Sequence, residues 1–141
     1  MALVLTSVVS NAQFHVGGGV GYSSKMCATG DLAIGYDFKA FDVQAGFVSH
    51  ISSTVGKGTL FNARLGHTVT INEYWSVQPS VGAVLNYQSN DDKSLNKGSM
   101  IYGLSVYKGI YNFPEAQIQF GVVYAQKTTI VSVGLRFSVI N

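Results

Sequence analysis

Apolar residues alternate with small or polar residues along most of the chain, with a period of two. Within residues 14–22, Phe14, Val20 and Tyr22 share one parity, whereas His15 and three glycines have the other. Successive side chains of a β-strand point to opposite faces of a sheet, so this period predicts strands. Eight stretches show the alternation: residues 14–22, 32–38, 41–47, 61–71, 75–87, 102–106, 118–124 and 131–139. The pattern therefore predicts an all-β chain.

The connections between these stretches alternate between compact and long. Compact turns are predicted near residues 39–40, 72–73 and 112–115. On the other side, the segments 23–30, 52–58 and 89–99 are longer and rich in Ser, Gly, Lys and Asp, and the fourth connection, 126–128, is short. Strands of roughly 9–11 residues joined in this way run up and down. We therefore expect an antiparallel barrel with tight turns at one end and longer loops at the other.

Composition helps to decide which face of this barrel is inside. Only 11% of the residues are charged, compared with about 25% in a typical soluble domain, while 47% are hydrophobic. No Lys, Arg, Asp or Glu falls on the apolar face within a predicted strand. The opposite face carries the glycines 17, 19, 21, 35, 46, 66, 82, 103, 121 and 134. Such a face fits a crowded lumen better than a water-facing surface, so we expect the apolar face to meet lipid.

Aromatic residues concentrate near both ends of the predicted strands. Two belts of rings, one at each membrane interface, are typical of barrels that span a bilayer. The predicted belts are Phe14, Phe38, Phe41, Trp75 and Phe137 at the turn end, and Tyr22, Tyr87, Tyr102 and Tyr124 at the loop end.

Three features make the chain similar to the small outer-membrane barrels of the OmpA/OmpX type. They are the eight amphipathic strands, the Ser-Asn-Ala-Gln junction at residues 10–13, and an aromatic residue, Phe137, near the end of the last strand. The resemblance implies an eight-stranded antiparallel up-and-down transmembrane β-barrel in the outer membrane of a Gram-negative-type envelope. His67 departs from the pattern because it falls on the lipid face. We expect either that it lies near the interface or that the fourth strand carries a bulge.

The first twelve residues read MALVLTSVVSNA. A short apolar stretch, 2–9, precedes Ser10 and Ala12, small residues at the two positions that a signal peptidase inspects. We therefore expect residues 1–12 to be the remnant of a signal peptide and 13–141 to be the barrel domain. The alternative is that these residues form a native first strand.

Polar side chains of the inward face are expected to fill the lumen as a structural network. An enclosed charge must be paired or hydrogen-bonded, so we expect Arg64 near Asp42 and Gln44, and Arg136 near His15. Side chains fill an eight-stranded lumen, which predicts no open pore; a proton or ion path is the alternative. The predicted network is His15, Asp37, Asp42, Gln44, Asn62, Arg64, Gln78, Gln119 and Arg136.

No residue set points to a specific reaction, so we predict no catalytic, cofactor or metal site. The basic residues are scattered singly, which argues against nucleic acid as a partner. We expect a monomer in contact with membrane lipid, whose segments 23–30, 52–58 and 89–99 meet a partner. Two alternatives stay open. One is an outer-leaflet lipid-modifying enzyme, in which His50 activates a hydroxyl of the adjacent Ser49, Ser52 or Ser53 as a nucleophile. The other is a soluble lipocalin-like ligand-binding barrel.

Overall fold

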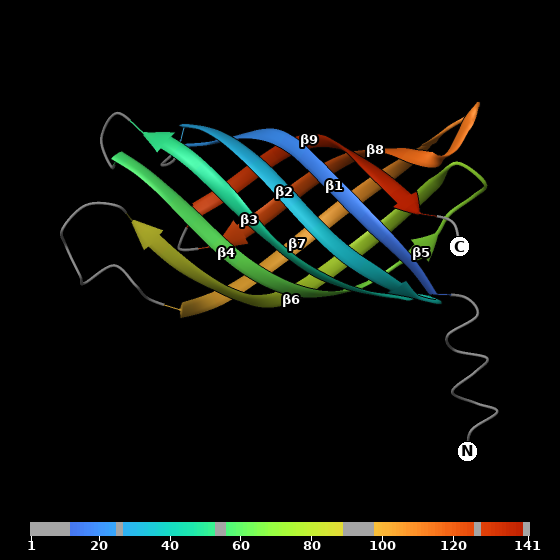
Figure 1. The fold of residues 1–141 in the computed structure, drawn as a ribbon, viewed down its shortest axis with the longest axis horizontal. Coiled ribbons are helices and arrows are strands. Elements are labelled where there is room, and N and C mark those ends of the chain that lie inside the picture. The colour runs from blue at the N-terminus through green and yellow to red at the C-terminus, as the bar shows by residue number, and fades with distance from the viewer. Residues whose placement is uncertain (1–11, 25–26, 53–55, 89–97, 126–127, 140–141) are drawn as a thin grey trace, which may run out of the picture.

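The computed structural model describes residues 12–24, 27–52, 56–88, 98–125 and 128–139, which form one continuous sheet (Figure 1). The strands are β1 (Ala12–Ser23), β2 (Cys27–Phe38), β3 (Phe41–Ser52), β4 (Gly56–His67), β5 (Val69–Thr70), β6 (Trp75–Gln88), β7 (Gly98–Ile110), β8 (Phe113–Ala125) and β9 (Thr128–Val139). In this part of the chain, no helix is long and apolar enough to cross a membrane.

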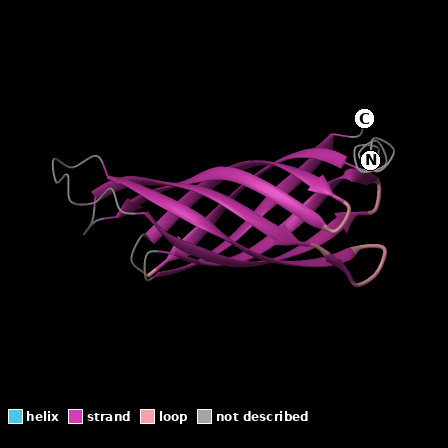
Figure 2. Cartoon of the chain, turned by 90° about the horizontal axis from the view of Figure 1, so that it is seen from below, coloured by secondary structure: helices cyan, strands magenta, loops and turns pink. Residues whose placement is uncertain are grey.

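The sheet closes into an eight-stranded antiparallel barrel. Each long strand pairs with the next long strand along the chain, so that β4 pairs with β6, and β1 also pairs with β9, which joins the eight long strands into a ring. The two-residue strand β5 continues β4 after a break at Thr68, whose amide donates to the carbonyl oxygen of Ala40 at 2.6 Å. The predicted fold class is therefore confirmed, and Figure 2 shows the strongly tilted strands of the closed barrel.

The strands are longer than predicted. The eight long strands have 12 to 14 residues instead of 9–11. The loop expected at 23–30 is wrong for residues 27–30, which begin β2 and pair with β1 and β3. Alternation continues through this segment, because Thr29 is buried while Ala28 and Gly30 are exposed. The outward positions of this segment carry small residues instead of apolar ones. The hydrophobic alternation is therefore not visible in the sequence, although the strand continues.

The other predicted loops are also shortened by pairing. Residues 56–58 belong to β4 and residues 98–99 to β7, whereas 53–55, 89–97 and 126–127 lie outside the described residues. The third compact turn consists of residues 111–112, since β8 already begins at Phe113. Less of the predicted loop sequence is therefore available as loop.

The tight turns lie together at one end of the barrel, where the described chain also begins and ends (Figure 1). Lys39 adopts a positive φ of 56° in the two-residue turn between β2 and β3. Between β5 and β6, the side chain of Asn72 accepts hydrogen bonds from the amides of Tyr74 and Trp75 at 2.9 and 3.0 Å. Asn is favoured in such turns because its side chain can replace a backbone acceptor.

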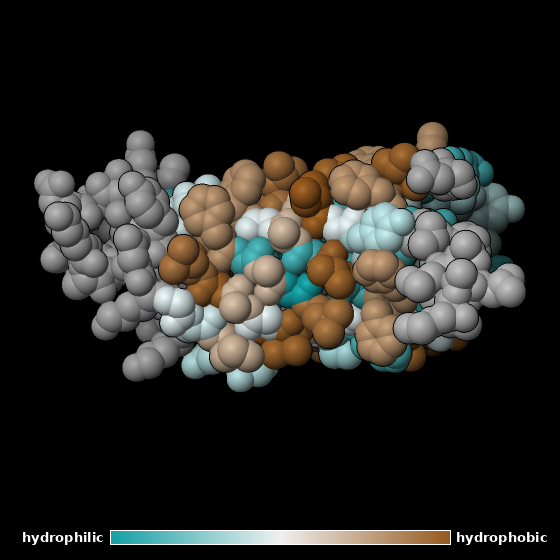
Figure 3. Space-filling model, turned by 60° about the horizontal axis from the view of Figure 1, so that its bottom comes forward, coloured by the Kyte–Doolittle hydropathy of each residue, from teal (hydrophilic) through white to brown (hydrophobic). Residues whose placement is uncertain are grey.

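The apolar face of the alternation points outward, as predicted. Val43, Val81 and Val133 are 48%, 42% and 45% exposed, whereas Arg136 is only 5% exposed. On the face that Figure 3 shows, apolar residues cover much of the described surface, with some hydrophilic residues between them.

The inward face contains a close approach that only glycine permits. A Cβ atom at Gly82 of β6 would overlap the backbone carbonyl oxygen of Ala63 on β4. The glycines of the inward face therefore let the wall curve tightly around a narrow lumen.

The interior is divided along its length, which the sequence did not predict. Towards the turn end it is filled by polar side chains, and nearer the loop end it holds an apolar layer together with the buried polar side chains of Ser23, Thr29, His50 and Thr128. The apolar layer consists of Leu60, Val84, Ile101, Ala125 and Ile130, with Val48 and Val123 packed against it. Several of these residues stand between two outward apolar residues, as Ile101 does between Met100 and Tyr102, so their inward direction was masked.

Candidate functional site in the barrel interior

Asp42 lies at the centre of the polar interior and is fully buried. His15 on β1 reaches across β2, and its Nε2 lies 2.8 Å from Asp42 Oδ1. Gln78 Nε2 donates to the second carboxylate oxygen at 2.9 Å, and Gln44 donates to the same oxygen. Three strands therefore supply donors to one carboxylate, which offsets the cost of removing its charge from water.

Arg136 on β9 is the cation that balances the acids of this region. Its Nη2 donates to Asp37, and its Nη1 lies 3.7 Å from Asp42 Oδ2. The guanidinium also lies over the ring of Tyr107, with 4.9 Å between the guanidinium carbon and the ring centroid. An ion pair and a cation–π contact thus fix one buried side chain.

Gln78 on β6 connects this region to β7 and to the break between β4 and β5. Its amide nitrogen also donates to Thr68 Oγ1 at 3.0 Å, and its oxygen accepts from Tyr107 Oη at 2.9 Å and from Gln44 at 3.2 Å. An amide has two donor hydrogens and two acceptor sites, so every one of them is used. The lack of a side chain at Gly66 makes room for the Gln78 side chain, because a Cβ atom at position 66 would lie 2.8 Å from Gln78 Cδ.

The structure joins most of the predicted network residues and leaves two outside. Arg64 Nη2 donates to Gln44 Oε1 at 3.1 Å, which connects Arg64 to Asp42 through one amide. Gln119 donates instead to Ser105 Oγ at 3.3 Å. The buried Asn62 Oδ1 has no hydrogen-bond partner among the described residues. One linked set contains His15, Asp37, Asp42, Gln44, Arg64, Gln78 and Arg136.

Sequence reasoning missed Tyr107 and Thr68. Tyr107 has the same parity as the inward Gly103 and Ser105, but the predicted strand stopped at residue 106. Thr68 lies at the break between β4 and β5 and points inward. Continuing the parity of the stretch 102–106 to its turn would have found Tyr107, whereas Thr68 already had the inward parity within the stretch 61–71 and was left out of the predicted network.

Three side chains of the network could in principle ligate a metal. One ligand atom from each of His15, Asp37 and Asp42 lies within 4.8 Å of the others. Arg136 contacts both carboxylates, so a positive charge is already in place and would repel a second cation. The arrangement therefore favours an internal ion pair.

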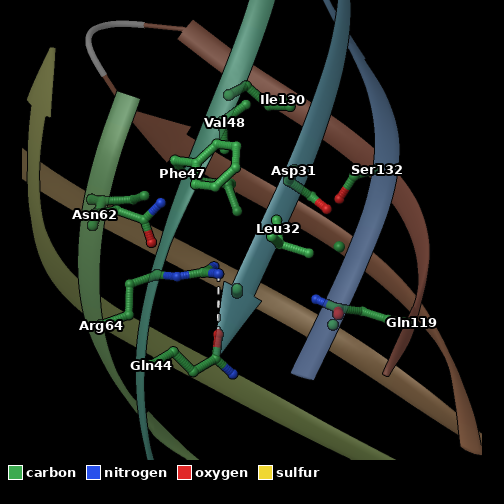
Figure 4. A pocket seen from close by; sticks show the side chains of 15 residues that line it. Asp31, Leu32, Gln44, Phe47, Val48, Asn62, Arg64, Gln119, Ile130 and Ser132 are labelled. Atoms are coloured by element: carbon green, nitrogen blue, oxygen red, sulfur yellow. Dashed lines mark hydrogen bonds between the residues drawn. The ribbon is translucent and has the colours of Figure 1, made fainter. Parts of the chain in front are cut away.

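Two spaces remain between these side chains. At the turn end, an open vestibule of about 400 Å³ is lined by Asp37, Lys39, Tyr107, Arg136 and neighbouring polar residues. In the middle of the lumen lies a small chamber of about 40 Å³, whose walls include Asp31, Asn62 and Arg64 (Figure 4). Polar groups line the vestibule, so solvent at the turn end meets the outer side of the Arg136–Asp37 pair.

His50 and Ser49 do not form a nucleophile and base pair. His50 is buried on the inward face of β3, whereas Ser49 is exposed and its Oγ lies 3.4 Å from Thr59 Oγ1. Consecutive strand residues point to opposite faces, so the imidazole and this hydroxyl are separated by the barrel wall.

His67 lies on the outer face at the turn end of β4. Its ring centroid is 5.0 Å from that of Phe41. The pairing of β4 with β6 shows no register shift, and the break at Thr68 follows His67. The bulge expected as one alternative is therefore wrong, and the position of His67 at the strand end is compatible with the other, a place near the interface.

The predicted aromatic belts point outward where their side chains are described. All except Tyr87 are exposed, and the side chain of Tyr87 lies outside the described ones. Lys108 Nζ lies 5.3 Å from the ring centroid of Trp75 at the turn end. An ammonium beside an aromatic ring is typical of a membrane interface.

Comparison with known proteins adds solved structures of the same architecture. No protein-family model and no curated protein sequence matches the chain. The de novo designed protein TMB2.3 is 15% identical, with a TM-score of 0.70 over 92% of this chain and 96% of that one. The Yersinia pestis outer membrane protein Ail in a phospholipid nanodisc is 17% identical, with a TM-score of 0.63 over 92% and 100%.

A third similar structure is the N-terminal β-barrel domain of Pseudomonas aeruginosa OprF. It is 12% identical, with a TM-score of 0.64 over 90% of this chain and 97% of that domain. Identities this low establish a shared architecture only. The chain thus has the fold of the eight-stranded transmembrane β-barrels, as found in outer-membrane proteins such as Ail and OprF.

Proposed function

We propose that this protein is an integral outer-membrane barrel with a closed lumen and a structural or loop-mediated interaction role. The observation that carries the proposal is the inverted distribution of polarity. Large apolar side chains such as Val20, Leu32, Leu65 and Leu104 are exposed around the wall, while charged side chains such as Arg136 point inward. A water-soluble barrel of the lipocalin type would have the opposite arrangement.

The two fillings of the lumen support a barrel without an open pore. The network around Asp42 and Gln78 joins opposite sides of the wall in the turn half. An apolar layer crosses the loop half, where Leu60, Ile101 and Ile130 are almost fully buried beside a few polar side chains such as His50. An ion would have to pass both a fixed set of charges and an apolar barrier.

The interaction role rests on the loop side of the barrel. We propose that segments 23–30, 52–58 and 89–99 meet a partner outside the cell, through the parts of them that are not paired in the sheet. A structure of Ail in complex with the heparin analogue sucrose octasulfate is similar to this chain, with 15% identity and a TM-score of 0.55. That similarity supports the barrel as a scaffold for binding, and leaves the chemistry of the partner to experiment.

We infer a role without catalysis. The separation of His50 from Ser49 argues against that pair, and the side chains of Ser52 and Ser53 lie outside the described ones. No enzyme active site is therefore assigned to the described residues.

Fractionation and conductance test the proposal directly. We expect the full chain in the outer-membrane fraction, with an unboiled band that migrates differently from the boiled band. In planar lipid bilayers we expect no stable conductance steps. A detergent-independent soluble monomer would contradict the membrane assignment, and steady conductance would contradict the closed lumen.

A further inference from the structure

The small chamber in the middle of the lumen lies between the polar network and the apolar layer. Val48, Ile101, Val123 and Ile130 line its loop side. Its polar walls come from five strands and carry the side chains of Asp31, Gln44, Asn62, Arg64, Gln119 and Ser132 (Figure 4).

Arg64 and Asp31 bring opposite charges into this chamber without touching each other. Among the described residues, no carboxylate forms an ion pair with Arg64, whose hydrogen bond goes to the neutral Gln44. The other inward acids, Asp37 and Asp42, are already held by Arg136. Asp31 accepts a backbone hydrogen bond from Gly19, and Arg64 has only its bond to Gln44. Because an incompletely solvated enclosed charge is costly, both charges favour a further solvating group.

Two buried atoms in the chamber walls have opposite hydrogen-bonding requirements. Arg64 Nε is a donor and Asn62 Oδ1 is an acceptor, and neither has a partner in the described part of the chain. A small anion would satisfy Arg64 but would be repelled by Asp31 and by the Asn62 oxygen. A metal cation would meet the reverse problem. Water both donates and accepts, so it satisfies both atoms at once.

The volume of the chamber agrees with water as its occupant. One buried water requires roughly 10–15 Å³ of such volume together with two to four polar partners. A volume of about 40 Å³ therefore has room for about three or four water molecules. We propose that a cluster of buried waters occupies the chamber and bridges the Arg64 guanidinium to the Asp31 carboxylate, with Asn62 as a further partner.

Solution NMR of the full chain in phospholipid nanodiscs tests the water cluster. We expect the side-chain amide protons of Asn62 and Gln119 to show cross-peaks at the water frequency in NOE and ROE spectra. Gln78 is the internal control, because both of its amide hydrogens are bonded within the network. Its amide protons should show no such cross-peak.

A pair of variants tests whether the water cross-peaks arise from the chamber. Ser132→Val places apolar atoms in the chamber wall, and we expect the Gln119 cross-peak to be lost. Ser138→Val, at the vestibule, is the matched control and should leave it unchanged. The wild-type spectrum remains decisive if Ser132→Val does not fold.

Two results would overturn the proposal. In the first, a folded wild-type protein shows no water cross-peaks at Asn62 and Gln119, which means an empty chamber. In the second, sodium bromide shifts these amide resonances saturably, which means that an anion is the occupant.

Discussion

His15 and Asp42 meet across an intervening strand: His15 lies on β1, Asp42 on β3, and their side chains pass the inner face of β2 to come within 2.8 Å. This contact is feasible because Gly35, on β2, pairs with His15 and has no side chain. A Cβ atom at Gly35 would meet the imidazole Cε1 and Nε2 atoms. Side-chain hydrogen bonds in the lumen therefore connect strands that are not neighbours in the sheet.

Removing the Asp42 carboxylate should destabilise the barrel strongly. Asp42→Ala leaves Arg136, Gln78 and His15 without their shared acceptor, and breaking a buried ion pair costs roughly 3–5 kcal/mol. Asp37→Ala is the matched control, since the Asp37 side chain is 22% exposed and water from the vestibule can replace it. Urea unfolding in detergent micelles, followed by Trp75 fluorescence, measures both. Equal effects of the two variants would contradict the central position of Asp42.

Tyr107→Phe should have a modest effect. It removes the hydroxyl that donates to Gln78 but keeps the ring beneath Arg136, so we expect a loss of about 1 kcal/mol in unfolding free energy. Tyr107→Leu also removes the cation–π contact and should cost more. Tyr102→Phe, on the outer face of the same strand, serves as the control. A Tyr107→Phe protein as stable as the wild type would show that this hydrogen bond contributes nothing.

The apolar layer should contribute to stability as a protein core does. Ile101→Ala removes buried methyl groups and leaves a cavity, for which we expect a loss of roughly 2–5 kcal/mol. Leu104→Ala truncates an outward side chain of the same strand, and lipid or detergent can fill the space that it leaves. The same urea titration compares the two. If Leu104→Ala proved the more harmful variant, the interior would not be packed as described.

Gly82→Val should prevent the barrel from closing, because the new side chain would overlap the backbone of β4 at Ala63. Ala83→Val, at the adjacent outward position, is the control and should fold. The difference in mobility between unboiled and boiled samples reports the folded fraction. A heat-modifiable band for Gly82→Val at the wild-type level would mean that the strands can move apart there.

The fold followed from the sequence because a period of two is a local property of each strand. The ends of the strands were harder to predict, because strand pairing continues where the outward residues are small, as at Ala28 and Gly30. The apolar layer was missed for a related reason. A residue such as Ile101, flanked by Met100 and Tyr102, shows no alternation, although its inward direction follows from the parity of the strand.

The partners inside the lumen depend on register, which the alternation does not contain. Arg136 was expected beside His15, yet its guanidinium contacts Asp37 and Asp42. Parity places all four side chains in the lumen, but their heights along the barrel depend on the stagger between strands. That stagger is fixed by the turns and by closure of the whole sheet.

The pairing of β1 with β9 makes the beginning and the end of the barrel wall a single seam. Near the loop end of this seam, the hydroxyls of Ser23 and Thr128 lie 2.8 Å apart although 105 positions separate them in the sequence. Before β9 arrives, one edge of β1 has no strand to bond with, and unbonded peptide groups are costly in hydrocarbon. Closure of the barrel wall in lipid therefore depends on β9, because only its pairing with β1 removes the open edge.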